Sequence, residues 1–420
     1  MSKRRKSEFH IFESLGFVSA LAMSLAAVST SPAQAFQDEG TIILCSIEPL
    51  SGIGTSFGQP NYLGKVIAVD EINAEGGIEI DGKKMKIKLI SEDDQAKPDQ
   101  GVPLFRKCAE SDKALVITGT QYSRVTESMW GLLQKKLDDP KDNGLQVPSM
   151  SFLSMKAGVT GVSEWAFRNA GDEPAQHELA MKLMEDKFGP FKNYSGAVEA
   201  NEGHSVAAWK AAYTPALERR NIKPAEYVEW YEADRDFSVQ IRKLKRADTD
   251  FFILSSHLQA NVGAMLEAQR QGFKPKMIIS HIGSDAAEMV ELGKQSTDGI
   301  VFPTAIHMAF PVPKVKWLSE EYKKRTKETY MPQFVGLGYE GIMIVKEAIV
   351  KAGIKNRPET LAEDRRKVRD QLAAIRDYKS FAGMTLNMNA NRDIVRPVYL
   401  VKITGGDFKL YWTPDKGFLF

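Results

Sequence analysis

Cysteine is scarce in this 420-residue chain, which has only Cys45 and Cys108 and no C-x-x-C pair. Without such a pair, redox-motif proteins and zinc ribbons lack support. Cys45 falls in an apolar run that predicts a strand, and Cys108 lies near the end of a predicted helix. A disulfide needs Cα atoms within about 7 Å of one another. Two buried thiols and one disulfide therefore both remain open.

Signatures of metal enzymes and nucleotide enzymes are missing as well. The chain has no H-E-x-x-H and no H-x-x-x-H. The loop Glu48–Gly58, which follows the first predicted strand, lacks a Lys-Ser or Lys-Thr pair and the glycine spacing of a dinucleotide fingerprint. We therefore expect no catalytic residue, no cofactor and no enzyme activity.

An excess of one charge is also lacking. Lys and Arg number 56 against 54 Asp and Glu, and the first 35 residues hold four basic and two acidic side chains. Residues 36–420 thus carry 52 charges of each sign. Nucleic-acid binders need a basic surface, so this balance argues against them. A charged fraction of 26% and a mean hydropathy of -0.29 exclude a membrane bundle and a disordered chain.

The N-terminus contains no hydrophobic run long enough to span a membrane. Its apolar stretch, Leu15–Val28, has about 14 residues, whereas a spanning helix needs roughly 20. Basic residues at 3–6 precede the stretch, and Ala33-Gln34-Ala35 follows it. This order is typical of an export signal. We predict a signal peptide over residues 1–35, cleaved after Ala35, and a periplasmic protein; an uncleaved anchor or a buried helix is the alternative.

What the rest of the chain does have is a regular alternation of strands and helices. Repeated βα units predict parallel sheets with helices on both faces, and ligands bind at the carboxyl ends of such strands. The length suits two lobes rather than one core. The predicted strands that matter most are Thr41–Ile47, Ala114–Thr118, Val147–Ser151, Trp165–Arg168, Gly196–Glu199, Phe251–Leu254 and Met277–Ile279.

A candidate anion site follows the strand Ala114–Thr118. The segment Gly119–Thr126 opens a helix, whose free N–H groups and positive dipole end favour a carboxylate. Ser123 can add a hydroxyl donor. The alternative is that Ser123 or Thr126 merely caps the helix.

Histidines follow three predicted strands of the middle segment: His204, His257 and His281. If these strands share one parallel sheet, the three imidazoles meet at one edge. We predict a polar cleft there, in which neutral histidines donate to a ligand carboxylate. A zinc site is the competing interpretation and requires three or four converging ligands. We expect no metal.

Several segments, taken in order, resemble a known family. The chain is similar to the solute-binding proteins of branched-chain amino acid ABC transporters, which have a type I periplasmic binding fold. The resemblance covers nearly all of the chain after residue 35. It rests on Pro49–Gly52, Phe57–Pro60, Ala68–Gly77, Ile117–Thr126, Phe167–Ala170, Asp236–Lys245 and Ala268–Phe273.

The resemblance implies a ligand site. In that family, a serine after the third strand and the loop after the fourth strand hold the ligand carboxylate. The matching residues in this chain are Ser123, Ser154 and Met155. The family usually has Thr or Ser where Met155 stands, so this wall is more apolar. Aromatic positions map near His204 and His257, and His281 falls where amino-acid binders place an acid. An aromatic or other organic acid is therefore as much expected as an amino acid. We also expect Ser56, Phe57 and Tyr122 to contact the ligand.

The resemblance also implies the organisation and the partners. The fold is α/β with two lobes and three crossings, near residues 158, 305 and 388. One lobe would be 36–158 plus 306–388, and the other 159–305 plus 389–420. We expect a monomer that captures a small carboxylate solute for a membrane permease, without nucleic acid. A ligand-sensing signalling module and a secreted metal-dependent hydrolase are the alternatives.

Overall fold

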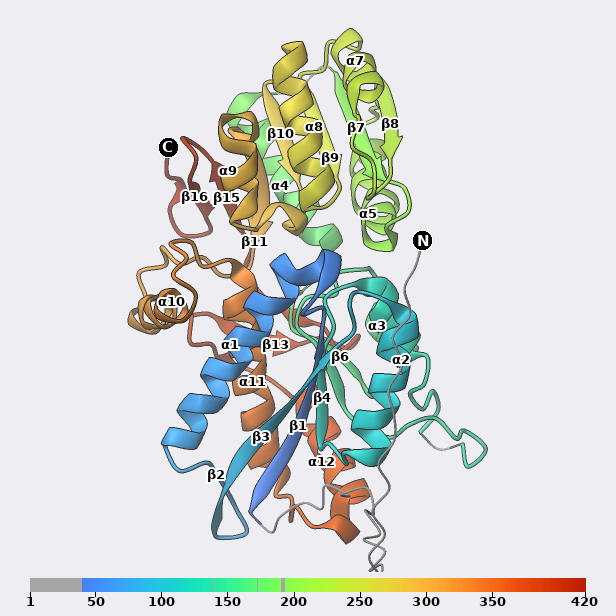
Figure 1. Cartoon of the computed structure of the whole chain (residues 1–420), viewed down its shortest axis with the longest axis vertical. Helices are drawn as coiled ribbons and strands as arrows, with labels where there is room; N and C mark the ends of the chain where they lie inside the picture. Colours follow the sequence, from blue (N-terminus) through green and yellow to red (C-terminus); the bar gives the residue numbers. More distant parts are fainter. Residues whose placement is uncertain (1–39, 138, 172, 190–192) are drawn as a thin grey trace, which may run out of the picture. The chain divides into compact units, whose positions relative to one another are not determined.

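Two separate β-sheets, each flanked by helices, organise the chain in the computed structural model (Figure 1). The structure describes residues 40–420 except 138, 172 and 190–192. The predicted signal peptide and its cleavage site lie outside the described residues. Within the described part, no helix combines the length and apolarity needed to cross a membrane. The predicted α/β architecture is confirmed.

The first sheet has six strands, and its centre is a strand buried on both faces. In β1 every residue but the first is buried, as expected for the interior of a parallel sheet. β3 and β4 pair with it in parallel, Leu44 lying opposite both Leu89 and Val116. The order is β2 (Ile78–Ile80), β3 (Lys83–Asp93), β1 (Thr41–Glu48), β4 (Val116–Gly119), β5 (Ser149–Ser151) and β6 (Ala166–Arg168).

The second sheet has eight strands, and its parallel part brings β7, β9 and β10 side by side. An antiparallel edge, formed by the C-terminal strands, extends it from β11. The order is β17 (Gly417–Phe418), β16 (Phe408–Thr413), β15 (Tyr399–Ile403), β11 (Ile300–Thr304), β10 (Met277–Ser280), β9 (Phe251–Ser255), β7 (Tyr194–Glu199) and β8 (Glu226–Trp230).

The helices and a small third sheet complete the architecture (Figure 1). Around the first sheet lie α1 (Thr55–Ala74), α2 (Pro98–Arg106), α3 (Ser123–Trp130), α10 (Pro313–Thr326), α11 (Gln333–Ala352) and α12 (Leu361–Ala373). Around the second lie α4 (Glu173–Phe188), α5 (Gly203–Ala208), α6 (Thr214–Arg219), α7 (Ser238–Arg246), α8 (Leu258–Gln271) and α9 (Glu288–Gly293). The third sheet contains β12 (Tyr378–Lys379), β13 (Thr385–Met388) and β14 (Ile394–Val395).

The pairing of β6 changes where the chain leaves the first sheet. β6 lies beside β5, with Ser151 opposite Arg168, so the first crossing follows Arg168 and not residue 158. Likewise Asp393, next to β14, forms a bridge with Arg168 of β6, so the chain still lies beside the first sheet after residue 388. β11 ends at Thr304, just before the predicted crossing near 305, which stays a prediction.

Two glycines let α1 and α11 pack backbone to backbone. A Cβ on Gly64 would lie 2.1 Å from the carbonyl oxygen of Val335, and one on Gly338 would lie 2.1 Å from that of Asn61. Both distances are far shorter than van der Waals contact, so neither position admits a side chain without moving the helices apart. This packing fixes the start of α11, which carries Phe334 toward the site described below.

Cys45 and Cys108 form a disulfide, with their Cα atoms 6.0 Å apart. It ties β1 to the segment that follows α2, and both cysteines are fully buried. The structure thereby selects one of the two possibilities that the sequence left open.

Candidate functional site

A small cavity lies where the carboxyl ends of strands from both sheets meet. Its free volume is about 30 Å³, enough for one or two waters. A solute the size of an amino acid therefore needs the two walls to separate. One wall comes from the first sheet and its helices: Phe57, Gln121, Tyr122, Ser123, Leu153, Met155 and Phe334. The other comes from the second sheet: Glu202, His204, His257, Ile282 and Gly283.

Most of the residues predicted from the sequence line this cavity. They are Phe57, Tyr122, Ser123, Met155, His204 and His257. Ser154 lies one layer behind, where its hydroxyl donates to Ser123 Oγ at 3.0 Å. His281 is fully buried beneath His204 and His257. Ser56 lies elsewhere, in a groove with Glu288 and Pro332.

Ser56 also belongs to a segment with catalytic spacing. Gly54–Gly58 fits the pattern G-x-S-x-G, which serine hydrolases place at a sharp turn between strand and helix. Here Ser56 lies inside α1, and its hydroxyl donates to Glu288 Oε1 at 2.6 Å. A catalytic serine of this type needs a histidine base beside its hydroxyl. Ser56 has the Glu288 carboxylate there instead. We assign no catalytic role to Ser56.

Ser123 begins α3, and no side chain caps this helix. Its hydroxyl accepts from Ser154 Oγ and from the backbone N–H of Lys156 at 3.3 Å. The hydroxyl of Thr126 donates to the carbonyl of Tyr122. The capping alternative is therefore wrong for both residues. With two donors pointing at its oxygen, Ser123 is left to donate its own proton, and the helix dipole at this end favours an anion.

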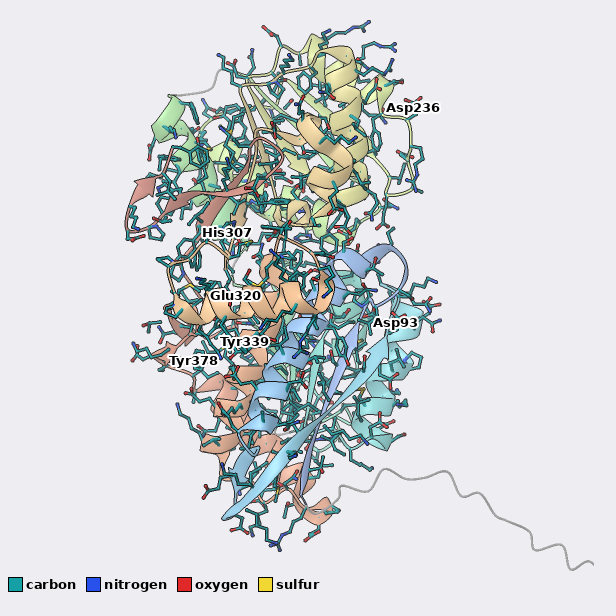
Figure 2. All side chains as sticks on the ribbon, turned by 60° about the vertical axis from the view of Figure 1, so that its left-hand side comes forward. Asp93, Asp236, His307, Glu320, Tyr339 and Tyr378 are labelled. Atoms are coloured by element: carbon teal, nitrogen blue, oxygen red, sulfur yellow. A yellow bond between two sulfur atoms is a disulfide. The ribbon has the colours of Figure 1, made fainter. Side chains whose placement is uncertain are left out.

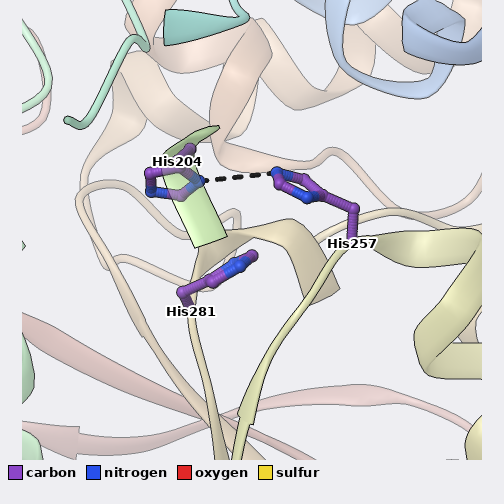
Figure 3. Close-up of side chains that lie close together, drawn as sticks. All are labelled: His204, His257 and His281. Atoms are coloured by element: carbon purple, nitrogen blue, oxygen red, sulfur yellow. Dashed lines mark hydrogen bonds between the residues drawn. The ribbon is translucent and has the colours of Figure 1, made fainter. Parts of the chain in front are cut away.

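The three predicted histidines converge on the opposite wall (Figure 3). His204 is in the first turn of α5 after β7, His257 precedes α8 after β9, and His281 follows β10. Because these strands are neighbours in the sheet, their carboxyl ends bring the rings together. His204 Nδ1 lies 3.4 Å from His257 Nε2. The predicted convergence is confirmed; a role in binding a ligand stays a prediction.

Buried glutamates hold the outer nitrogens of two of these rings. Glu173 Oε1 lies 2.7 Å from His204 Nε2, and Glu199 Oε2 lies 2.7 Å from His257 Nδ1. Burial alone would raise the pKa of Glu173, but the charge of His204 and hydrogen bonds from His177 and His204 lower it to about 2. Burial alone would lower the pKa of His257, but the Glu202 and Glu199 carboxylates raise it to about 9. His257 is thus a cation at neutral pH.

Aromatic rings cover this cation from the other wall. The Tyr122 ring stacks on His257 with centroids 5.8 Å apart and an interplanar angle of 25°. The guanidinium of Arg124 lies 5.0 Å from the centroid of the same tyrosine ring and 3.8 Å from Glu232. Phe57 contacts His257 edge-on at 6.0 Å. Aromatic and charged side chains therefore make contacts between the two walls.

Three residues that line the cavity each have a buried polar atom without a partner among the described residues. They are Gln121 Oε1, Tyr122 Oη and Glu202 Oε1. Buried polar groups are satisfied in more than about nine of ten cases, so three such atoms on residues that line one cavity favour the binding of a polar group there. Glu202 is the notable one, because a buried carboxylate oxygen favours a cationic donor.

Sequence reasoning missed the acidic residues of this wall. Glu199 is the last residue of β7, and Glu202 follows it. Both lie at the same strand end as His204, so their positions in the sequence could have predicted them as site residues. Glu173 reaches the histidines from the start of α4, and Phe334 reaches the cavity from α11 in the other wall. Nothing in the local sequence around these two residues indicates the cavity, because helix packing brings them there.

Comparisons with known proteins identify the family of this chain. The profile of the family described as "Periplasmic binding protein" matches residues 41–407. The leucine-, isoleucine-, valine-, threonine-, and alanine-binding protein of Pseudomonas aeruginosa is 23% identical over 77% of this chain and 81% of its own. A Leu/Ile/Val-binding protein homolog of Brucella melitensis is 24% identical over 73% and 78%.

Solved structures with the same fold include proteins that are named for, or contain, different small molecules. A leucine binding protein of Thermotoga maritima aligns with a TM-score of 0.76 at 20% identity, over 89% of this chain and 99% of its own. A solute binding protein of an R. palustris ABC transporter, crystallised with benzoate, aligns with a TM-score of 0.73 at 14% identity over 90% and 96%. At these identities the structures show a shared fold.

Proposed function

The chain belongs to the periplasmic binding protein family, and we propose that it is the solute-binding component of an ABC importer. Its solute would be a small molecule with a carboxylate, either an amino acid or an aromatic acid, bound between the two walls of the cavity. The family consists of binding proteins, and we propose that this chain likewise has no catalytic activity. We propose a periplasmic location and a membrane permease as partner; cleavage after Ala35 stays a prediction.

One observation supports this function above the others: Gln121, Tyr122 and Glu202, from both walls, line one cavity, and each has a buried polar atom without a partner among the described residues. Gln121 and Tyr122 come from the first wall and Glu202 from the second. A solute that bonds to all three links the walls, so it binds the closed form more tightly than the open one and shifts the population toward closure. A membrane permease can then recognise the closed form.

The polarity of the cavity supports a carboxylate at one end. Ser123 and the start of α3 face the cavity from the first wall, and the His257 cation faces it from the second. A carboxylate between them would receive charge-assisted hydrogen bonds, which are about twice as strong as neutral ones.

Glu202 supports an amino acid as the solute, since its free oxygen suits an ammonium group. The sequence has no acid at the position after β10 where His281 stands, and this absence argued against an amino acid as the solute. The Glu202 carboxylate weakens that argument. The aromatic rings of Phe57, Tyr122 and Phe334 support an aromatic acid equally well.

The lobes that we propose follow the sheets. One comprises residues 40–168 and 305–395, and the other 173–304 and 396–420. Two buried arginines support a hinge where the crossing segments run together. Arg168 Nε lies 2.8 Å from Asp393 Oδ1, and Arg396 Nη2 lies 2.7 Å from Asn169 Oδ1.

A thermal-shift screen of the purified protein with amino acids, keto acids and aromatic acids tests the proposed function. A bound solute stabilises the folded state by RT ln(1 + [L]/Kd), so a true ligand raises the melting temperature by an amount that grows with the logarithm of its concentration above Kd. We expect one chemical class to raise it and the uncharged amides of the same compounds to leave it unchanged. If no carboxylate shifts the melting temperature, or the amides act equally, the proposal is wrong.

A further inference from the structure

The histidine cluster has the geometry of a metal site that the binding function does not require. One ring nitrogen from each of His204, His257 and His281 lies within 4.8 Å of the other two. Two nitrogens bound to one tetrahedral zinc ion, at 2.0–2.1 Å each, are roughly 3.3 Å apart. His204 Nδ1 and His257 Nε2 are already 3.4 Å apart. The third nitrogen, on His281, needs a small inward movement.

The surroundings of the rings match those of metal-bound histidines. Ligand histidines usually donate their outer N–H to a carboxylate or a carbonyl, which fixes the ring and raises its basicity. Here Glu173 holds the outer nitrogen of His204 and Glu199 holds that of His257. Both glutamates are almost completely buried. This leaves the inner nitrogens of both rings facing each other and His281 (Figure 3).

His281 differs from the other two rings. Its Nδ1 accepts the backbone N–H of Gly283 at 2.9 Å, so in the neutral ring Nε2 carries the proton and points to Ser205 Oγ, 3.4 Å away. Coordination through Nε2 by a neutral ring therefore requires the proton to move to Nδ1, and the ring then gives up its hydrogen bond from the Gly283 N–H.

We propose that His204, His257 and His281 bind one divalent transition-metal ion of the zinc class at the floor of the cavity. Three imidazoles leave a fourth position open, as in zinc sites that receive an exogenous ligand. His204 and His257 line the cavity, whereas His281 lies beneath it, so the open position faces the space between the walls. A solute carboxylate can occupy it; this second part rests on the proposed function.

Equilibrium dialysis of the chelator-treated protein against zinc alone, with metal analysis, tests the site. We expect one zinc per chain. His281→Gln should abolish stoichiometric binding, and Glu173→Gln or Glu199→Gln should weaken it roughly 10- to 100-fold. His307→Gln is the matched control, because His307 is buried in the segment between β11 and α10 (Figure 2), lines a different groove and does not belong to the cluster. Circular dichroism verifies that each variant folds.

Loss of zinc binding in folded His281→Gln and its retention in His307→Gln support the site. No bound zinc in the unmodified protein, or equal binding in both variants, overturns it. If a histidine variant fails to fold, the absorption spectrum of the Co²⁺-loaded unmodified protein decides: tetrahedral nitrogen coordination supports the site, and the spectrum of aqueous Co²⁺ overturns it.

Thermal shifts with benzoate and L-leucine, with and without zinc, test the open position. A shift that needs zinc supports it. A shift of the same size in chelated protein overturns the open position but leaves the proposed function intact. If neither compound shifts the melting temperature under either condition, docking at the metal is overturned, and the full solute screen then decides the proposed function independently of zinc stoichiometry.

Discussion

At the scale of single residues, Ser123 gives the clearest prediction for the proposed solute site. Its hydroxyl already accepts two hydrogen bonds, from Ser154 and Lys156, which leaves its proton for the solute. Ser123→Ala should weaken binding of the carboxylate solute by roughly 1–3 kcal/mol, because a charged acceptor loses a buried donor. Isothermal titration calorimetry measures the change.

Ser128→Ala is the control for this substitution, since Ser128 is on the same helix and its hydroxyl donates to the Arg124 carbonyl. It should leave affinity unchanged. Equal affinities of the Ser123 variant and the unmodified protein would remove Ser123 from the site.

Asp285 gives a second prediction at the residue scale. It is fully buried and accepts from Tyr330 Oη at 2.6 Å and from the Gln333 N–H at 3.2 Å, at the start of α11. Burial raises its pKa from 3.8 to about 6. The folded state therefore binds the proton more tightly than the unfolded state, so this group's contribution is greatest below pH 4 and is lost as the pH rises through 6.

Asp285→Asn removes this titration. The unfolding free energy of the unmodified protein, relative to that of the variant, should fall by about 2 kcal/mol between pH 4 and pH 7. Urea unfolding at several pH values measures the difference. A difference that is constant with pH would show that Asp285 has an ordinary pKa.

At the scale of elements, the sequence predicts where the strands lie and which strand ends meet at one edge of a sheet. It predicts the pairing of the strands only in part. Runs such as Thr41–Ile47 have no charge, which indicates a strand buried on both faces, and β1 is one. The strand Trp165–Arg168 was predicted close to β6, yet assigned to the wrong sheet. A three-residue strand has too little pattern to specify its neighbour, and the pairing of Ser151 with Arg168 is a long-range property.

Long-range packing also limits how much of the site the sequence can predict. The strand ends predicted His204, His257 and His281 because parallel topology converts strand order into proximity. Ser56 was predicted from its place after β1, but it lies within α1 and faces Glu288. The rotation of a helix over the cavity depends on packing, which the sequence pattern of α1 does not determine.

The disulfide between β1 and the segment after α2 yields a prediction for these elements. It closes a loop with a sequence separation of 63 residues. In the chain-entropy account such a link stabilises the fold by about 4 kcal/mol. The double variant Cys45→Ala, Cys108→Ala should lose about this much unfolding free energy in urea titrations, and dithiothreitol should affect the unmodified protein similarly. Two reactive thiols in the denatured, non-reduced protein would contradict the link.

At the scale of the whole molecule, a buried ion pair lies next to the last of the crossings that we propose between the lobes. Arg396 Nη2 lies 2.6 Å from Glu340 Oε2, and both side chains are buried. Arg396→Ala should destabilise the protein by about 3–5 kcal/mol, because it leaves the Glu340 carboxylate buried without a partner. The paired variant Arg396→Met, Glu340→Gln should recover most of the loss in thermal unfolding. If the single and paired variants unfold alike, the ion pair does not hold the crossing.

The crystal structure of the protein with a solute that raises its melting temperature tests the central claim most directly. The account predicts the solute between the two walls, its carboxylate within about 2.5–3.2 Å of Ser123 Oγ and its other polar groups on Tyr122 or Glu202. A solute bound outside this cavity, for example in the groove lined by His307 and Phe310, would contradict it.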